Sequence, residues 1–204
     1  MASKSGFMKD ALVLFAITLV SGLCLGFVYD LTKEPIAQAT IDKNNRTYQE
    51  VLASASTFAD VDGSAEAIAE LAASGELAGF GGVAIESVLA GTDASGTVVG
   101  YVINSLSNDS YGGAVKISVG FDSEGTITGV GIREINDTPG LGLKAKEPAF
   151  RDQYVGKNEE ALTVTKMGAS ASNEIDAISG ATVTSNATTN AVNAALYYLH
   201  NCMN

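Results

Sequence analysis

Hydrophobic and polar residues follow three patterns along this chain of 204 residues. Residues 11–29 form one run of apolar and small residues that contains no charged side chain. Residues 83–132 hold short stretches in which apolar residues alternate with polar or small ones, and residues 185–199 place alanines at helical spacing. These patterns predict an apolar helix at the N-terminus, strands in the middle and a helix near the C-terminus.

The apolar run is long enough to span a membrane. Nineteen helical residues at about 1.5 Å each cover nearly the whole of a hydrocarbon core of about 30 Å. A cleaved signal peptide is the alternative, but its apolar region usually spans about 7–15 residues, and here Phe27 and Val28 continue the run. We therefore expect a retained single-pass anchor. Cys24 within it is either a buried structural cysteine, the commoner case, or a ligand shared with another subunit.

The charges that flank the span predict its orientation. Lys4 and Lys9 precede it, whereas only Lys33 follows closely. The positive-inside rule then places the N-terminus in the cytoplasm and the body of the protein on the outer side of the cell membrane.

Turn and cap signals divide the rest of the chain. Pro35 suits a first helical turn, and a polar helix is expected from there to about residue 53. Ser64 is a candidate N-cap for a helix that Gly75 ends, and two Asp-x-x-Gly turns, at residues 93–96 and 122–125, separate β-rich runs. The further expected elements are strands at 83–89, 97–103, 115–121, 127–132 and 162–166 and helices at 148–154 and 185–199.

Strands gathered in the middle and helices at the ends indicate an α+β fold with a mainly antiparallel sheet flanked by helices. We expect an N-terminal segment over residues 1–34 with the transmembrane helix at about 11–29. A helical stalk or connector over 35–80 and a single domain over 81–204 would follow.

Composition and charge exclude several classes of function. The net charge is −11, and such acidity argues against binding nucleic acid, which requires clustered Lys and Arg. Two cysteines and one histidine exclude an iron–sulfur cluster held by this chain alone and most zinc sites, and they argue against a Ser–His–Asp triad. We expect no catalytic residue and no metal site; redox chemistry here would need an organic cofactor.

Three segments could bind such a cofactor. Residues 176–185, DAISGATVTS, run into the last helix, where free backbone N–H groups and the positive end of the helix dipole suit a phosphate. On the residues alone, the commoner interpretation is a plain helix start with Thr182, Thr184 or Ser185 as its cap. The loop Thr138–Gly142 and the turn Ser110–Gly113 allow a close approach of backbone to a ligand, and Tyr111 could stack on a flat ring.

Taken together, SYGGAVKISVGFD, TPGLG, EPAFRDQYVGK and DAISGATVTS resemble the flavin-binding G subunits of the Rnf complex, an ion-translocating ferredoxin:NAD oxidoreductase. The C subunits of the sodium-pumping NADH:quinone reductase share the same FMN-binding domain. The resemblance covers about residues 100–199.

The resemblance implies that a flavin transferase moves FMN from FAD onto Thr182, making a covalent phosphoester. The turn that the transferase would recognise comprises Asp176, Ser179, Gly180 and Ala181. The expected flavin contacts are Thr138, Gly140, Leu141 and Gly142, with Tyr111 and Lys116 as weaker candidates.

The implied function is electron relay through FMN within a membrane complex of several subunits, coupled to Na⁺ or H⁺ movement. A C-type subunit of the quinone reductase is one alternative, and a membrane-tethered binding module without redox function is another. A hydrolase with Ser179 as nucleophile is a third, although no nearby histidine would activate the serine.

Overall fold

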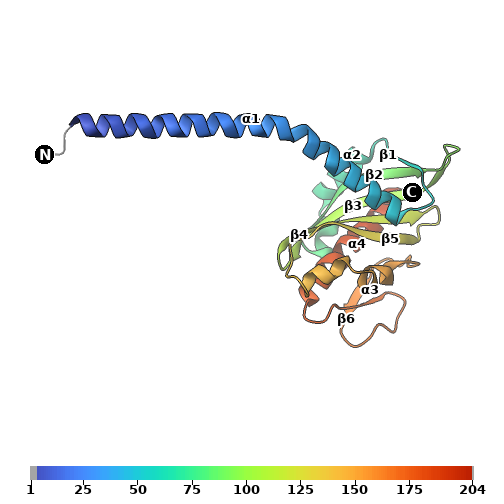
Figure 1. The fold of residues 1–204 in the computed structure, drawn as a ribbon. Helices are drawn as coiled ribbons and strands as arrows, with labels where there is room; N and C mark the ends of the chain where they lie inside the picture. The colour runs from blue at the N-terminus through green and yellow to red at the C-terminus, as the bar shows by residue number, and fades with distance from the viewer. Residues whose placement is uncertain (1–3, 204) are drawn as a thin grey trace. The chain divides into compact units, whose positions relative to one another are not determined.

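The computed structural model describes residues 4–203, without the side chains of residues 4–6, 37 and 38. Residues 1–3 and 204, which belong to the expected N-terminal segment and flavin-binding domain, lie outside the described residues. The chain divides into two compact units, Met1–Lys43 and Asn44–Asn204, and the second contains all the strands (Figure 1).

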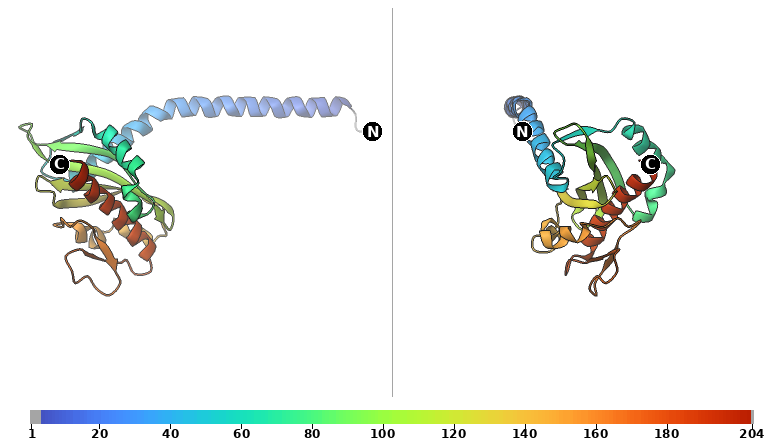
Figure 2. Two further views of the ribbon diagram at one scale, coloured as in Figure 1. Left: turned by 180° about the vertical axis from the view of Figure 1, so that it is seen from behind. Right: turned by 90° about the vertical axis from the view of Figure 1, so that its right-hand side faces the viewer.

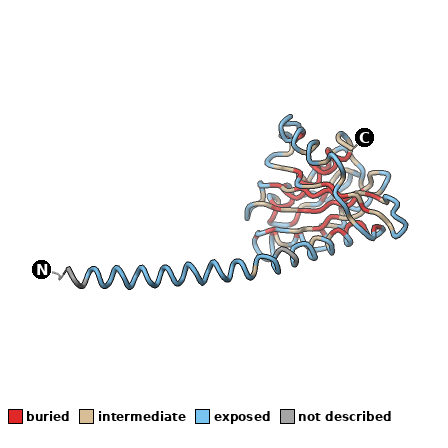
Figure 3. Tube along the Cα trace, turned by 90° about the horizontal axis from the view of Figure 1, so that it is seen from above, coloured by how far each residue is buried: buried red, intermediate tan, exposed pale blue. Residues whose placement is uncertain are grey.

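Helix α1 (Lys4–Val51) supplies all the described residues of the first unit. It is long and apolar enough to cross a membrane, with a mean hydropathy of 2.5 in its most apolar stretch, and its large apolar residues between Phe7 and Ile41 are exposed (Figure 3). These properties fit a membrane anchor. Our expectation that a separate helix begins at Pro35 is wrong, because Pro35 lies inside α1; proline removes one backbone hydrogen bond but its φ is compatible with a helix.

The second unit is built on an antiparallel sheet, as the alternating pattern predicts. Its order is β1-β2-β3-β4-β5, and the Asp93 and Asp122 turns join the second to the third strand and the fourth to the fifth. The strands run longer than the apolar stretches suggest, and the first one was not predicted from the sequence. Their bounds are β1 Thr57–Asp60, β2 Val83–Thr92, β3 Val98–Ser110, β4 Gly113–Asp122 and β5 Ile127–Glu134.

Both faces of this sheet are covered. Helix α4 (Thr182–Cys202) crosses one face (Figure 2), where Ile103 joins the main core. Val102, the preceding residue of β3, points to the opposite face and packs in a second cluster with Tyr48 and Val51. The α+β architecture that the sequence predicts is thus confirmed, with the last turns of α1 as an additional layer.

Glycines let the end of α1 approach the sheet closely. A Cβ at Gly120 would lie 2.2 Å from the Val51 carbonyl oxygen, and one at Gly129 would lie 2.9 Å from Val51 Cα. Beside this contact the buried Asn104 side chain donates hydrogen bonds to Tyr48 Oη at 3.0 Å and to Ser87 Oγ at 2.8 Å. Packing and polar contacts together hold residues 44–51 against the sheet.

The first short helix tests the predicted cap residues. Helix α2 (Ser64–Ser74) begins at Ser64, but its N-cap is Gly63, so the prediction of Ser64 as the cap is wrong by one residue. Gly75 ends this helix with a φ of 74°, as predicted, and the 3-10 helix η1 (Glu76–Phe80) follows.

The C-terminal third consists of short elements that precede the long helix α4. The expected helix at 148–154 is split into an α and a 3-10 segment, and the expected strand at 162–166 pairs in parallel with a strand that was not predicted. Helix α4 begins at Thr182, three residues earlier than predicted. The short elements are η2 Gly142–Lys146, α3 Pro148–Arg151, η3 Asp152–Tyr154, β6 Thr163–Thr165 and β7 Glu174–Asp176.

Candidate functional site

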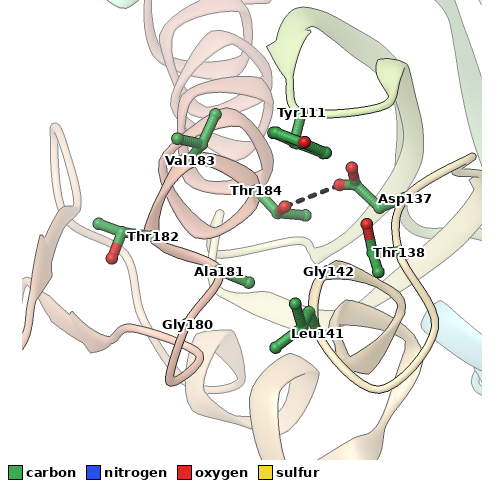
Figure 4. A pocket seen from close by; sticks show the side chains of 10 residues that line it. All are labelled: Tyr111, Asp137, Thr138, Leu141, Gly142, Gly180, Ala181, Thr182, Val183 and Thr184. Carbon is green, nitrogen blue, oxygen red and sulfur yellow. Dashed lines mark hydrogen bonds between the residues drawn. The ribbon is translucent and has the colours of Figure 1, made fainter.

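The three candidate segments, far apart in sequence, meet at one cavity of about 520 Å³. Figure 4 shows the β3–β4 turn, the loop after β5 and the start of α4 around this space. The lining residues are Tyr111, Asp137, Thr138, Leu141, Gly142, Gly180, Ala181, Thr182, Val183 and Thr184.

Asp137 connects the three segments. This residue is 6% exposed, and its carboxylate accepts hydrogen bonds from Ser110 Oγ at 2.6 Å, from the Gly112 backbone N–H at 2.6 Å and from Thr184 Oγ1 at 2.7 Å. Hydrogen bonds to an ionised acceptor are about twice as strong as neutral ones. One carboxylate therefore ties the β3–β4 turn and the first turn of α4 to the loop after β5.

Two glycines make room for this arrangement. A Cβ at Gly142 would lie 2.6 Å from Asp137 Cβ, and one at Gly112 would lie 2.1 Å from the Asn136 carbonyl oxygen. In the same loop Gly140 has a φ of 77° and open space around it, so there glycine supplies a backbone conformation rather than space.

Ser185 shapes the turn that leads into α4. The Ile178 N–H donates to Ser185 Oγ at 2.9 Å, and Ser185 Oγ donates to the Ala181 carbonyl at 3.0 Å. The N-cap residue Ala181 offers no side-chain hydrogen bond to the helix, so the first backbone N–H groups of α4 remain available to an anion at the cavity.

The three hydroxyl groups at the start of α4 differ in accessibility. Thr184 is 1% exposed and bonded to Asp137, and Ser185 is fully buried and occupied as described. Thr182 is partly exposed, and in Figure 4 its hydroxyl points away from Asp137. Within residues 4–203 its side chain makes no hydrogen bond. Thr182 is thus the most accessible of these three hydroxyl groups.

Asp176 and Ser179 do not line this cavity. They border a neighbouring cavity of about 410 Å³ together with Lys144, Glu147 and Gln153. The Asp176 N–H donates to Gln153 Oε1 at 2.7 Å, and the Asp176 carboxylate accepts from the Ala169 N–H at 2.6 Å. The EPAFRDQYVGK segment therefore positions the strand that enters the SGAT turn.

Two further predicted contacts are placed differently. Lys116 forms ion pairs with Glu86 at 3.3 Å and Glu134 at 3.7 Å and does not line the cavity. Gly140 is exposed in its loop, while its neighbour Leu141 lines the cavity, where its Cδ2 atom would lie 3.1 Å from a Cβ added at Gly180.

The exposed apolar side chains at the cavity suit a flat aromatic ligand. Tyr111 is 77% exposed, Val183 52% and Leu141 43%, and the volume falls in the range of small-molecule sites, about 300–1,000 Å³. Apolar surfaces for a ring and free amides for a phosphate are the features that FMN requires.

Asp137 and Val183 were not predicted as site residues from the sequence. The signal for Asp137 was an acidic residue directly before a Pro- and Gly-rich loop. Val183 carries no comparable signal, because an apolar residue in a helix is usually a core residue.

Comparison with known proteins supports this interpretation of the cavity. The model of the FMN-binding domain family matches residues 110–197. The chain is 34% identical over 195 residues to the G subunit of the Na(+)-translocating ferredoxin:NAD(+) oxidoreductase complex of Acetobacterium woodii, covering 95% of this chain and 91% of that protein. It is 30% identical over 195 residues to the G subunit of the proton-translocating complex of Clostridium ljungdahlii, covering 92% of each.

A solved structure shares the fold. The crystal structure of the C subunit of the Na(+)-translocating NADH-quinone reductase from Parabacteroides distasonis has a TM-score of 0.51 and 21% identity, and the match covers 79% of this chain and 93% of that one. This similarity concerns the fold alone.

Proposed function

The chain belongs to the family of G subunits of ion-translocating ferredoxin:NAD(+) oxidoreductase complexes, and we propose that it carries FMN joined covalently to Thr182. As a member of this family it is an electron-transfer subunit of a membrane-bound redox complex and binds FMN. The alternative of a C-type subunit is less well supported, because the match to such a subunit from Vibrio anguillarum covers only 45% of this chain.

The accessibility of the Thr182 hydroxyl is the main support for attachment at this residue. Thr184 and Ser185 are buried and hydrogen-bonded, so attaching FMN to either hydroxyl would displace the first turn of α4. A phosphodiester on Thr182 retains one negative charge, which the free amides and the dipole of α4 stabilise.

Attachment is a phosphoryl transfer catalysed by a flavin transferase. The Thr182 oxygen forms a bond to the phosphorus on the FMN side of FAD, the pyrophosphate bond breaks, AMP leaves and the hydroxyl proton is released. Bound FMN would be the carrier that takes up electrons and passes them on. Leu141, Val183 and Tyr111 would hold the ring, with Thr138, Gly142, Gly180 and Ala181 forming the adjoining walls of the cavity. Asp176 and Ser179 would present the turn to the transferase.

The test is co-expression of the full-length chain with a flavin transferase, followed by a denaturing gel viewed under ultraviolet light. The wild type is expected to show flavin fluorescence at the mass of the chain. Thr182→Val should lose it, and the matched variant Thr184→Val should keep it. Fluorescence that survives in Thr182→Val would move the attachment elsewhere, and a dark wild-type band would refute covalent flavin and favour a binding module.

We also propose that the flavin domain lies outside the cytoplasm, as the lysines around the span predict. Ser95 lies on an exposed turn of this domain, so a Ser95→Cys variant in a Cys202→Ser background tests sidedness. A membrane-impermeant maleimide should label the new cysteine on intact spheroplasts. Labelling only after lysis would show that the domain lies in the cytoplasm.

A further inference from the structure

Asp137 is the one charged residue among the ten that line the flavin cavity. Lys144, two residues after Gly142, lines the neighbouring cavity instead. Within the described part of the chain, the cavity wall therefore contains a carboxylate and no basic side chain.

The hydrogen-bond partners of Asp137 suit an ionised carboxylate. They are two hydroxyls and one backbone N–H, at 2.6–2.7 Å, and an ionised carboxylate can accept from all three. These donors stabilise the negative charge without neutralising it. The dipole of α4 offers about half a positive charge at the same cavity, which the phosphate of a bound FMN would share.

From this placement we infer that Asp137 holds the reduction potential of the flavin low. The inference rests on the proposed function, since it requires FMN in this cavity. Two-electron reduction with uptake of one proton adds one negative charge to the ring. A nearby carboxylate raises the free energy of that product, so the protein is a stronger reductant than it would be without Asp137. The electrons come from the donor subunit of the complex.

The direct test is Asp137→Asn in the full-length chain loaded with FMN, titrated against redox dyes of known potential. At the midpoint potential of the wild type, the ratio of reduced to oxidised flavin should rise about tenfold, which equals about 30 mV for a two-electron couple. Asp93→Asn is the matched control. Asp93 also accepts three hydrogen bonds, from the Ser95 N–H, Ser95 Oγ and the Thr97 N–H, but does not line the cavity, and its variant should leave the ratio unchanged.

Thr184→Val and Ser110→Ala provide a test of sign. Each keeps the charge of Asp137 and removes one donor, so the carboxylate is less well compensated and the ratio of reduced to oxidised flavin should fall. If Asp137 had a purely structural role, the flavin potential would shift in the same direction in Asp137→Asn, Thr184→Val and Ser110→Ala, or would not change in any of them.

The outcomes separate the two proposals. A wild type without flavin refutes the proposed function. A flavin-loaded Asp137→Asn variant with an unchanged potential refutes the role of Asp137 alone. If Asp137→Asn does not fold, the ratio of reduced to oxidised flavin in Thr184→Val decides. A ratio lower than in the wild type supports the inference, and an equal or higher ratio overturns it.

Discussion

Replacing Gly142 by alanine tests whether close packing against Asp137 organises the flavin cavity. The new methyl group would lie 2.6 Å from Asp137 Cβ and 2.7 Å from Asp137 Cγ and Oδ2. Neither residue is exposed enough to move into solvent, because Gly142 is buried and Asp137 is 6% exposed. The carboxylate must therefore shift and lose at least one of its three donors.

The expected cost combines two terms. Overpacking costs about 1–3 kcal/mol, and losing a hydrogen bond to a charged group costs about 1.5–3 kcal/mol, so Gly142→Ala should destabilise the protein by about 2.5–6 kcal/mol. For a domain of this size the Tm should fall by roughly 5–24 °C. Flavin incorporation should fall as well, since the cavity wall is displaced.

Calorimetric unfolding of the flavin-free, full-length chain in detergent measures this change. Gly140→Ala is the control in the same loop. Its new methyl group meets open space at a φ of 77°, so it should cost only the left-handed backbone strain of about 1–2 kcal/mol and leave flavin incorporation intact.

A double-mutant cycle with Asp137→Gly isolates the contact. If the clash causes the loss, Gly142→Ala should cost at least 1 kcal/mol less in the Asp137→Gly background, well beyond the additivity limit of about 0.5 kcal/mol. Additive costs, or a Gly142→Ala protein as stable as the wild type, would refute the reasoning.

Three further predictions concern the sheet. Burial raises the pKa of Glu86, but the hydrogen bond and charge of Arg133, together with Lys116, outweigh burial and hold the pKa below its ordinary value of 4.5. The stability advantage of the wild type over Glu86→Gln should therefore be present above pH 4.5 and be lost as the pH falls from there through the lower pKa of the folded protein. Urea unfolding at several pH values measures this change. Gly120→Ala places a methyl group against the Val51 carbonyl and should cost about 3 kcal/mol, seen as a lower urea midpoint. Asn104→Ala leaves the buried hydroxyls of Tyr48 and Ser118 and the half-buried hydroxyl of Ser87 without this partner and should cost about 2–4 kcal/mol by the same measurement.

Local features of the chain predicted much of the fold. The Asp122 turn illustrates why, because its carboxylate accepts from the Glu124 and Thr126 N–H groups, all within five residues. The missed strand β7 shows the limit. It has three residues and pairs in parallel with β6, and so short an element has no periodicity of its own.

The candidate site divides in the same way. The sequence presented three segments with turn glycines and hydroxyls, and each is found at the cavity. Asp137 and Val183 were not predicted, because their roles depend on contacts between segments separated by dozens of residues. Lys116 was a weaker candidate for a flavin contact, yet the register of β4 pairs it with Glu134.

The sequence alone determined that residues 11–29 are apolar over the length of a membrane span and that hydroxyl groups stand at residues 182, 184 and 185. Only the tertiary structure decided which hydroxyl is accessible. Helix α4 begins at Thr182, and successive helical residues are about 100° apart, so Thr182 and Thr184 point in nearly opposite directions. Asp137, delivered by a distant loop, then buries Thr184 and leaves Thr182 open.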